Sequence, residues 1–418
     1  MPNAIAATAA AGMEFLPLLF LLAALIASAK IFGSLSLRLG QPAVLGELVA
    51  GLILGPSLLH LASLPFLRSG DPGVTIHLIG ELGVILLMFA AGLEVDVDDL
   101  RRSGRPAALA GILGVMVPLG GGAAVSLAFG HEAPAAIFIG IVLGATSVSI
   151  SAQTLLELGR LRSREGITML GAAVVDDVLV IAVMTVILAT TGGEGGSFGA
   201  VGLTLLQMVI VLSLVGFVSL RLLPRLVEWA HRLRVSQGLL SFSLAGVLLL
   251  AWFTEFAGGV AAITGAFLAG LGLSRSHLRD EIEHGVSRLA YGFFVPIFLV
   301  DIGLRSNLRE MQADQWGFAA VIVGVAILSK PIGAGLGSWL GGFDPGSAIR
   351  LGLGMISRGE VGLIVAGIGI GEGFLGPELF RVAVLVVLST TLITPPILRW
   401  AFSRGEVQNA TVGESDSA

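Results

Sequence analysis

Two adjacent aspartates, Asp176 and Asp177, lie within an otherwise apolar stretch that runs from Leu170 to Val183. An ionised carboxylate in the middle of a membrane helix is energetically expensive, so such residues are rare and usually functional. One lysine, Lys330, also falls in an apolar stretch, and it is one of only two lysines in the chain. An acidic pair with a single buried ammonium is typical of a proton-coupled cation site.

Helix geometry separates the two aspartates. Adjacent positions of an α-helix point about 100° apart, so one side chain can face a water-filled cavity while its neighbour faces another helix. Na⁺ and Li⁺ are hard cations that prefer oxygen ligands. We assign Asp177 to this cation and proton site, where a proton and a metal ion compete for one carboxylate. The further oxygen ligands would come from Thr146, Ser147 and Ser149.

Lys330 is the predicted partner of Asp176. An ion pair that opens when the cation binds would release a second proton, because a buried ammonium gives up its proton readily. The exchange would then move net charge across the membrane. Two structural alternatives stay open: an ion pair that only braces the helices, and a buried hydrogen-bond network that holds both aspartates.

The composition places these residues in a membrane protein. Of 418 residues, 55% are hydrophobic and only 13% are charged, and the mean hydropathy is +0.94. A soluble domain of this size needs a far more polar exterior. Fifty-nine glycines fit helices that pack closely. The absence of cysteine excludes disulfides, thiolate catalysis and Cys-ligated metals. We expect no enzymatic activity, no cofactor and no nucleic-acid partner.

Thirteen apolar segments are long enough, or nearly so, to cross a hydrocarbon core of about 30 Å. The predicted fold is therefore an all-α polytopic membrane protein. The approximate limits are 15–37, 42–59, 75–93, 106–129, 134–156, 165–190, 199–222, 236–255, 259–273, 287–304, 315–339, 346–370 and 378–402.

The basic residues predict the orientation. With the N-terminus outside, eighteen of the 24 Lys and Arg residues fall at inner ends or loops and four at outer ones, as the positive-inside rule requires. The first fourteen residues lack the basic region of a cleaved signal peptide, so we expect the first segment to be a retained span. The polar residues 403–418 are expected to form a disordered cytoplasmic tail.

The fifth and twelfth segments share an unusual pattern. Small and polar residues occupy the middle of each, over Gly144–Ser151 and Gly354–Gly362. Interrupted segments at matching positions of two halves are a sequence signal of a transporter site. Five segments, then two, then five would form an inverted repeat. The alternative is that these small residues only aid helix packing. Three residues of the twelfth segment are assigned a structural role where the two segments cross: Ser357, Arg358 and Glu360.

These features together resemble the monovalent cation:proton antiporters, specifically the second of the large antiporter superfamilies. The likeness extends over nearly the whole chain, and the order and spacing of its motifs make chance similarity improbable. The motifs are Gly46–Pro56, Leu87–Glu94, Gly144–Val148, Val175–Val178, Phe294–Val300 and Ser357–Leu363. The double aspartate is similar to that of the electrogenic sodium type.

The resemblance implies a single transmembrane antiporter domain over 1–402 with thirteen helices. A core domain, spans 106–190 and 315–402, would contain two crossed broken helices. A dimerisation domain, spans 15–93 and 236–304, would be joined to the core by a linker span, 199–222. In such proteins the core slides against the dimerisation domain, which is an elevator-like form of alternating access. The resemblance also implies that Asp177 is the essential carboxylate and that Asp176 pairs with Lys330.

The sequence thus predicts a homodimeric exchanger of Na⁺ or Li⁺ for H⁺ in a prokaryotic inner membrane. A K⁺/H⁺ antiporter is an alternative, since selectivity depends on cavity size and ligand number. A cation channel or a sodium-coupled symporter of an organic anion is an alternative of another class. Three acidic residues in or near the membrane have no assigned role: Glu47, Glu81 and Asp301.

Overall fold

The computed structural model of the chain describes residues 2–59, 61, 72–190, 198–233, 235–305, 309, 311, 313 and 315–415. Over these residues the regular structure is helical. Two compact units can be separated, one formed by Met1–Leu87 with Ser287–Glu310 and the other by Met88–Val286 with Met311–Ala418. We describe each unit by itself.

The first unit packs the N-terminal helices against one later segment. Its elements are α1 (Pro2–Arg38), α2 (Ala43–Leu54), α3 (Pro72–Glu94) as far as Leu87, the π-helical turn η3 (Ala290–Phe294) and α14 (Val295–Leu304). Helices α2 and α14 approach closely because Gly51 faces the carbonyl of Val300, where any Cβ would overlap it. The core of this unit is aliphatic and includes Leu21, Leu25, Ile76 and Ile297.

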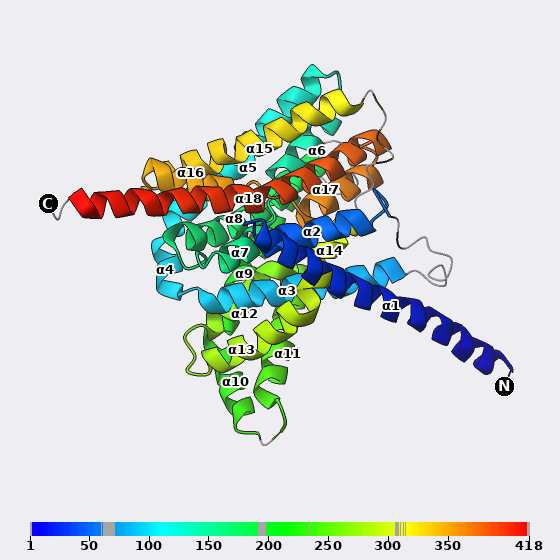
Figure 1. Cartoon of the computed structure of the whole chain (residues 1–418). Helices are drawn as coiled ribbons and strands as arrows, with labels where there is room; N and C mark the ends of the chain where they lie inside the picture. Colours follow the sequence, from blue (N-terminus) through cyan, green and yellow to red (C-terminus); the bar gives the residue numbers. More distant parts are fainter. Residues whose placement is uncertain are drawn as a thin grey trace. The chain divides into compact units, whose positions relative to one another are not determined.

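The second unit holds the remaining helices (Figure 1). They are α4 (Val97–Arg102), α5 (Gly104–Ala128), α6 (Ala133–Gly144), α7 (Val148–Glu157), α8 (Arg164–Thr190), α9 (Phe198–Arg221), α10 (Leu223–His231), α11 (Gly238–Gly258), α12 (Ala262–Leu273), α13 (Arg279–Leu289) as far as Val286, α15 (Gln315–Leu340), α16 (Pro345–Gly354), α17 (Glu360–Gly371) and α18 (Pro377–Ser415).

Helices α5 and α15 are in contact along much of their length. Glycines of α15 make this possible, because a Cβ at Gly333 or Gly337 would overlap the carbonyl oxygen of Leu113 or Leu109 on α5. Backbones that approach this closely gain dispersion contacts, which drive helix association where both surfaces are apolar.

Ten helices within the described residues are long and apolar enough to cross a membrane, and three shorter apolar helices accompany them. Each of these thirteen lies within or overlaps one of the segments predicted from the sequence. Large apolar side chains are exposed on the outer surface of α9, among them Leu203, Leu206, Ile210 and Phe217. A helix surface of this kind is suited to lipid rather than water. The protein is therefore an all-α, multi-pass membrane protein, as predicted.

The fifth and twelfth predicted segments are each split into two helices. Between α6 and α7 the chain is non-helical over 145–147, and between α16 and α17 it leaves the helix over 355–359. Helix α16 begins with Asp344 as its N-cap, whose carboxylate accepts a hydrogen bond from the backbone N–H of Ser347 at 2.9 Å. This bond to the ionised form holds the pKa of Asp344 below its usual range.

Two terminal regions of predicted segments differ from expectation. Helix α18 continues to Ser415, where the sequence predicted a disordered tail over 403–418; residues 416–418 lie outside the described part. Extension of an existing helix needs no new nucleus, which explains why polar residues can follow the last apolar turn. The tenth predicted segment starts earlier, since the amphipathic helix α13 leads directly into η3 and α14.

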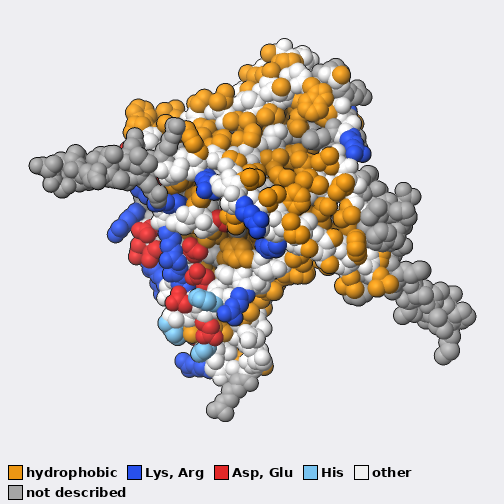
Figure 2. Space-filling view, in the orientation of Figure 1, with side chains coloured by type: hydrophobic (Ala, Val, Ile, Leu, Met, Phe, Trp, Pro, Cys, Tyr) orange, Lys and Arg blue, Asp and Glu red, His pale blue; other side chains and the backbone are white. Residues whose placement is uncertain are grey.

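Charged side chains of the second unit gather over α4 and α13, while apolar side chains cover much of the rest of the visible surface (Figure 2). The ion pairs there include Arg275 with Asp98 and Arg162 with Glu94. These arginines belong to the inner loops predicted from the positive-inside rule. The structure thus brings arginines of separate loops to one region of this unit.

Candidate ion-binding site

Helix α8 carries both adjacent aspartates into the interior of the second unit. Asp176 is 1% exposed and Asp177 is 6% exposed. Lys330, on α15, donates from Nζ to Asp176 Oδ2 at 2.8 Å, and its side chain is completely buried. Thr146, in the non-helical stretch between α6 and α7, donates its hydroxyl to the same oxygen. Asp176 therefore belongs to a buried ion pair.

The surroundings of this ion pair are close-packed. Gly114 on α5 faces it, and a Cβ there would lie 3.7 Å from both Asp176 Oδ1 and Lys330 Nζ. Asp176 Oδ1 is buried and has no hydrogen-bond partner among the described residues. Because both side chains are almost completely buried, the electrostatic attraction between them is much stronger than it would be at a surface.

Asp177 points to a different helix. Thr264, in the first turn of α12, donates from Oγ1 to Asp177 Oδ2 at 2.9 Å. Both residues border a small cavity of about 10 Å³ whose other walls are apolar, including Val174 and Phe267. A volume of this size corresponds to about one water molecule. The carboxylate of Asp177 thus adjoins a space that is sized for a single small polar species.

Thr264 was not identified from the sequence. It lies in a short apolar helix and has no neighbouring polar residue in sequence that would mark it. A hydroxyl within a membrane span was the one available signal, and many such hydroxyls bond to their own backbone. Thr254 on α11, for example, donates to the carbonyl of Leu250.

The three hydroxyl residues expected near the cation lie in two places. Thr146 bonds to Asp176 rather than Asp177. The Ser147 and Ser149 hydroxyl groups are 3.0 Å apart and both residues are buried. The structure therefore places Thr146 on the ion-pair side of the site, because the non-helical backbone turns its hydroxyl toward Oδ2 of Asp176.

The two helix interruptions contact each other through their backbones. Ser147 donates its N–H to the carbonyl of Ser357 at 2.8 Å, and the Ser357 hydroxyl donates to the carbonyl of Ser147 at 2.6 Å. Ser151 adds a contact to the Ser357 hydroxyl at 3.0 Å. These bonds satisfy polar groups that would otherwise be unpaired in an apolar interior.

Arg358 fills the junction between the interruptions and is fully buried. Its Nη2 and Nε donate to the carbonyl of Leu143 at 2.8 and 3.2 Å, and its Nη1 donates to the carbonyl of Ile356. Leu143 lies in the last turn of α6, where free carbonyls carry partial negative charge. The positive guanidinium thus offsets the partial negative charge at the C-terminal end of α6. Glu360 begins α17, and its side chain lies outside the described residues.

The three acidic residues without a predicted role have basic partners in the first unit. Glu47 on α2 is buried and accepts a hydrogen bond from Lys30 on α1 at 2.9 Å. Asp301 on α14 lies 3.0 Å from a ring nitrogen of His77, whose other ring nitrogen faces the third acid, Glu81. Neither group belongs to the Asp176 and Asp177 site.

A buried carboxylate beside a small cavity, next to a carboxylate whose charge is balanced by an ammonium, has the chemistry to hold a small cation or a proton. Such a carboxylate on a polytopic helical fold points to an ion transporter. Comparison with known proteins agrees: residues 21–404 match the family model described as sodium/hydrogen exchanger, transmembrane. The chain belongs to this family of cation/proton antiporters, which are transporters rather than enzymes.

Individual relatives are similar over almost their whole length. The Na(+)/H(+)-K(+) antiporter GerN of Bacillus cereus is 40% identical, with 93% of this chain and 97% of that protein covered. A Na(+)/H(+) antiporter of Enterococcus hirae is 35% identical, covering 93% and 98%. Among solved structures, the sodium proton antiporter MjNhaP1 of Methanocaldococcus jannaschii has a TM-score of 0.67 at 17% identity, covering 92% and 97%. At 17% identity, the similarity to MjNhaP1 shows a shared fold.

Proposed function

We propose that the protein exchanges Na⁺ or Li⁺ for H⁺ and that Asp177 binds the transported cation and proton in turn. The observation that carries this proposal is the separation of the two adjacent aspartates. The charge of Asp176 is balanced by a buried ion pair with Lys330, whereas Asp177 accepts a hydrogen bond from the hydroxyl of Thr264 and borders a cavity. A carboxylate in the second setting can accept either a proton or a metal ion.

Oxygen ligands for the cation would be the Asp177 carboxylate and hydroxyls of the α6–α7 interruption. Of these hydroxyls, Thr146, Ser147 and Ser149 were the sequence-based candidates. Na⁺ and Li⁺ favour such hard ligands. The ion pair between Asp176 and Lys330 would open when the cation binds. A proton released by Lys330 would then make the exchange electrogenic.

We further propose that the chain crosses the membrane thirteen times and that two sets of five of these helices form an inverted repeat. Among the antiporters, the chain resembles the subgroup with a double aspartate. In this arrangement α5 corresponds to α15, and the broken pair α6–α7 corresponds to α16–α17. A core over 106–190 and 315–402 would move against a dimerisation domain over 15–93 and 236–304, with 199–222 as the linker. The protein would be a homodimer in a prokaryotic inner membrane, with its N-terminus outside and its C-terminus in the cytoplasm.

K⁺ is the second candidate substrate. The similar antiporter GerN of Bacillus cereus is named for K⁺ as well as Na⁺. The cavity at Asp177 has space for about one water-sized species, so selectivity between Na⁺ and K⁺ depends on the number and arrangement of the oxygen ligands. A channel or a sodium-coupled symporter of an organic anion would need a continuous pore or a larger cavity.

Proton exchange in proteoliposomes tests the assignment of Asp177. Acid-loaded vesicles should become alkaline inside when Na⁺ or Li⁺ is added, with a smaller response to K⁺ and Rb⁺. Asp177→Asn should reduce this response to that of empty vesicles, because the neutral amide cannot hold a proton or replace the carboxylate charge. Asp280→Asn, a change on the amphipathic helix α13, is the matched control and should exchange normally. Exchange by Asp177→Asn would refute the assignment.

Charge movement tests the role of Lys330 separately. If its ammonium carries the second proton, Lys330→Gln should exchange Na⁺ for H⁺ without net charge transfer, so an imposed membrane potential should no longer change the rate. Undiminished dependence on the potential would show that Lys330 only braces α15 against α8.

A further inference from the structure

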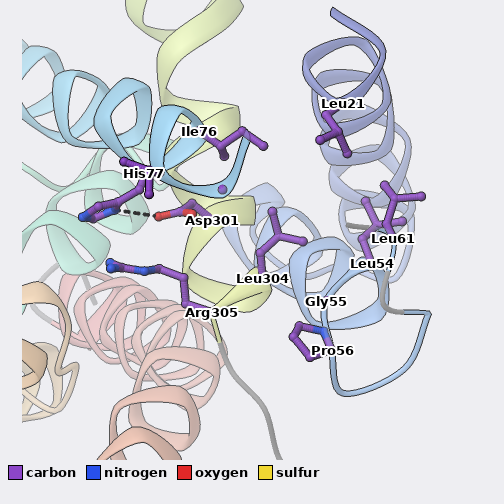
Figure 3. Close-up of a pocket in the computed structure, with 12 residues that line it drawn as sticks. Leu21, Leu54, Gly55, Pro56, Leu61, Ile76, His77, Asp301, Leu304 and Arg305 are labelled. Atoms are coloured by element: carbon purple, nitrogen blue, oxygen red, sulfur yellow. Dashed lines mark hydrogen bonds and ion pairs between the residues drawn. The ribbon is translucent and has the colours of Figure 1, made fainter. Parts of the chain in front are cut away.

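Two cavities of similar volume differ in the side chains that line them. The cavity of the first unit, about 350 Å³, is bordered mainly by apolar residues such as Leu21 and Leu54, and Arg305 is the one arginine among its described lining residues (Figure 3). The cavity of the second unit, about 370 Å³, has three arginines among its described lining residues, and we call it the arginine cavity. Its described lining residues are Asp99, Arg102, Ser103, Arg162, Arg164 and Ile167.

The three arginines come from two separate parts of the chain. Arg102 is the last residue of α4, directly before the start of α5. Arg162 lies in the turn before α8, and Arg164 is the first residue of α8. A bias of arginine toward the loops on one side of a membrane is common and requires no shared site. That bias does not explain why the packing of α4 and α5 against α8 brings arginines of two loops to one cavity.

Arg102 is available to a ligand. Its side chain is exposed, and among the described residues its guanidinium has neither an ion-pair nor a hydrogen-bond partner. A guanidinium has five N–H donors and binds a phosphate group through two parallel hydrogen bonds. The neighbouring Ser103 makes no side-chain cap bond to α5, so its hydroxyl is a further donor at the cavity.

Arg164 is held in a fixed orientation at the same cavity. Its Cζ lies 4.0 Å from the centroid of the Phe343 ring, and its Nη2 donates to the carbonyl of Gly342 at 3.3 Å. These contacts use one face and one donor of the guanidinium, so other donors stay available to a ligand. Ile167 lies one turn further along α8 and also lines the cavity. The positive end of the α8 dipole therefore adds to the attraction for an anion.

The charges of the lining residues also favour an anion. Three arginines and one aspartate, Asp99, give the lining a formal charge of +2. Arg162 lies 3.5 Å from the carboxylate of Glu94, so a charge of +1 remains when that group is included. A cavity with excess positive charge and guanidinium donors suits a phosphate group, which is negative and only accepts hydrogen bonds when fully ionised.

The arginine cavity lies where two candidate membrane spans begin, Gly104–Ala128 and Arg164–Ile187. The ends of spans lie at the depth of the phospholipid headgroups, and basic pockets between spans bind such headgroups. Further along α5, Ile112 and Met116 are exposed on one face of the helix, and they are suited to contact an acyl chain.

We propose that the arginine cavity binds a phosphate group through Arg102 and Arg164. Its position at the ends of two spans favours the headgroup of an anionic phospholipid, and inorganic phosphate is the other source of the same chemical group. The bound phosphate would join α4 to α8 and would stabilise the packing of α4 and α5 against α8. This proposal does not depend on which cation is transported.

Thermal unfolding of the purified full chain in detergent tests the proposal, with the fluorescence of its five tryptophans as the signal. A ligand that binds only the folded state raises Tm as its concentration exceeds its Kd. Phosphatidylglycerol should raise Tm more than phosphatidylcholine with the same acyl chains, because the phosphatidylcholine headgroup has no net charge. Inorganic phosphate is compared with chloride at equal ionic strength, and we expect it to act only at higher concentrations than phosphatidylglycerol.

Three variants connect the effect to the cavity. Arg102→Gln should need about tenfold more phosphatidylglycerol for the same rise in Tm, because a charge-assisted hydrogen bond to phosphate is lost. Without lipid it should melt like the unmodified protein, because Arg102 has no partner among the described residues. Arg164→Gln should weaken the response in the same way. Arg225→Gln removes an exposed arginine of α10; it makes the same change in charge outside the cavity, so its response should be unchanged.

The outcomes distinguish the two sources of phosphate. An effect of phosphatidylglycerol alone that depends on Arg102 assigns the cavity to a lipid headgroup. An effect of inorganic phosphate at the same concentrations, with the same dependence on Arg102, assigns it to the free anion. The proposal is overturned if the three variants respond alike to both ligands. It is also overturned if neither ligand acts more strongly than its control, phosphatidylcholine or chloride.

Discussion

Replacement of Lys330 by methionine isolates the energetic role of the buried ion pair between Asp176 and Lys330. Methionine fills a similar volume but removes the ammonium that lies 2.8 Å from Asp176 Oδ2. Among the described residues, the buried carboxylate then keeps the Thr146 hydroxyl as a hydrogen-bond donor but has no cation beside it. Removal of one member of a buried ion pair typically lowers the free energy of unfolding by about 3–5 kcal/mol. Replacement of both members by uncharged residues often changes that free energy little. Lys330→Met should therefore be strongly destabilised, and the double variant Asp176→Asn/Lys330→Met should recover most of the loss.

The expected shift in Tm follows from the chain length. An unfolding entropy of about 2.1 cal/mol/K per residue over 418 residues amounts to about 0.9 kcal/mol per degree, so a loss of 3–5 kcal/mol lowers Tm by about 3–6 °C. This is a lower bound, because a membrane protein unfolds with less entropy gain when its helices persist. Arg275→Met breaks an exposed pair with Asp98 and should cost less than about 1 kcal/mol.

Thermal melting of the four proteins in one detergent at one pH completes the double-mutant cycle of Asp176 and Lys330. The two single changes and the double change should give a coupling free energy of at least about 3 kcal/mol. A double variant as unstable as the sum of the single variants would refute the reasoning, since it would mean that the two charges do not compensate each other.

Three further changes test single contacts. Thr264→Val removes the donor to Asp177, so protons should compete better and the apparent KM for Na⁺ at neutral pH should rise about tenfold; Thr264→Ser is the control. Gly337→Ala should cost about 1–3 kcal/mol in a melting assay by forcing α15 from α5, whereas Gly120→Ala, with open space around it, should be neutral or stabilising. Asp344→Ala should cost about 1 kcal/mol at neutral pH. Because the pKa of Asp344 is lowered on folding, this difference should vanish as pH falls below about 4.

Much of the fold follows from local properties of the chain. Apolar stretches of membrane-spanning length mark the helices, and the small and polar residues around Thr146 and Ser357 mark the places where two of them are interrupted. Both signals can be read within a window of about 20 residues, because helix length and backbone hydrogen bonding depend on neighbours in sequence. The short helix α12 is also apolar, but nothing in its sequence indicates that it contributes a side chain to the site.

The sequence by itself determined the class of protein and the presence of two carboxylates that must point apart, since adjacent positions of any α-helix do so. The tertiary structure decided which partner each one has. Thr264 lies 87 positions from Asp177, Lys330 lies 154 positions from Asp176, and Asp301 lies 224 positions from His77. Contacts over such separations depend on how rigid helices pack, so only the folded chain distinguishes a neutralised carboxylate from one that borders a cavity.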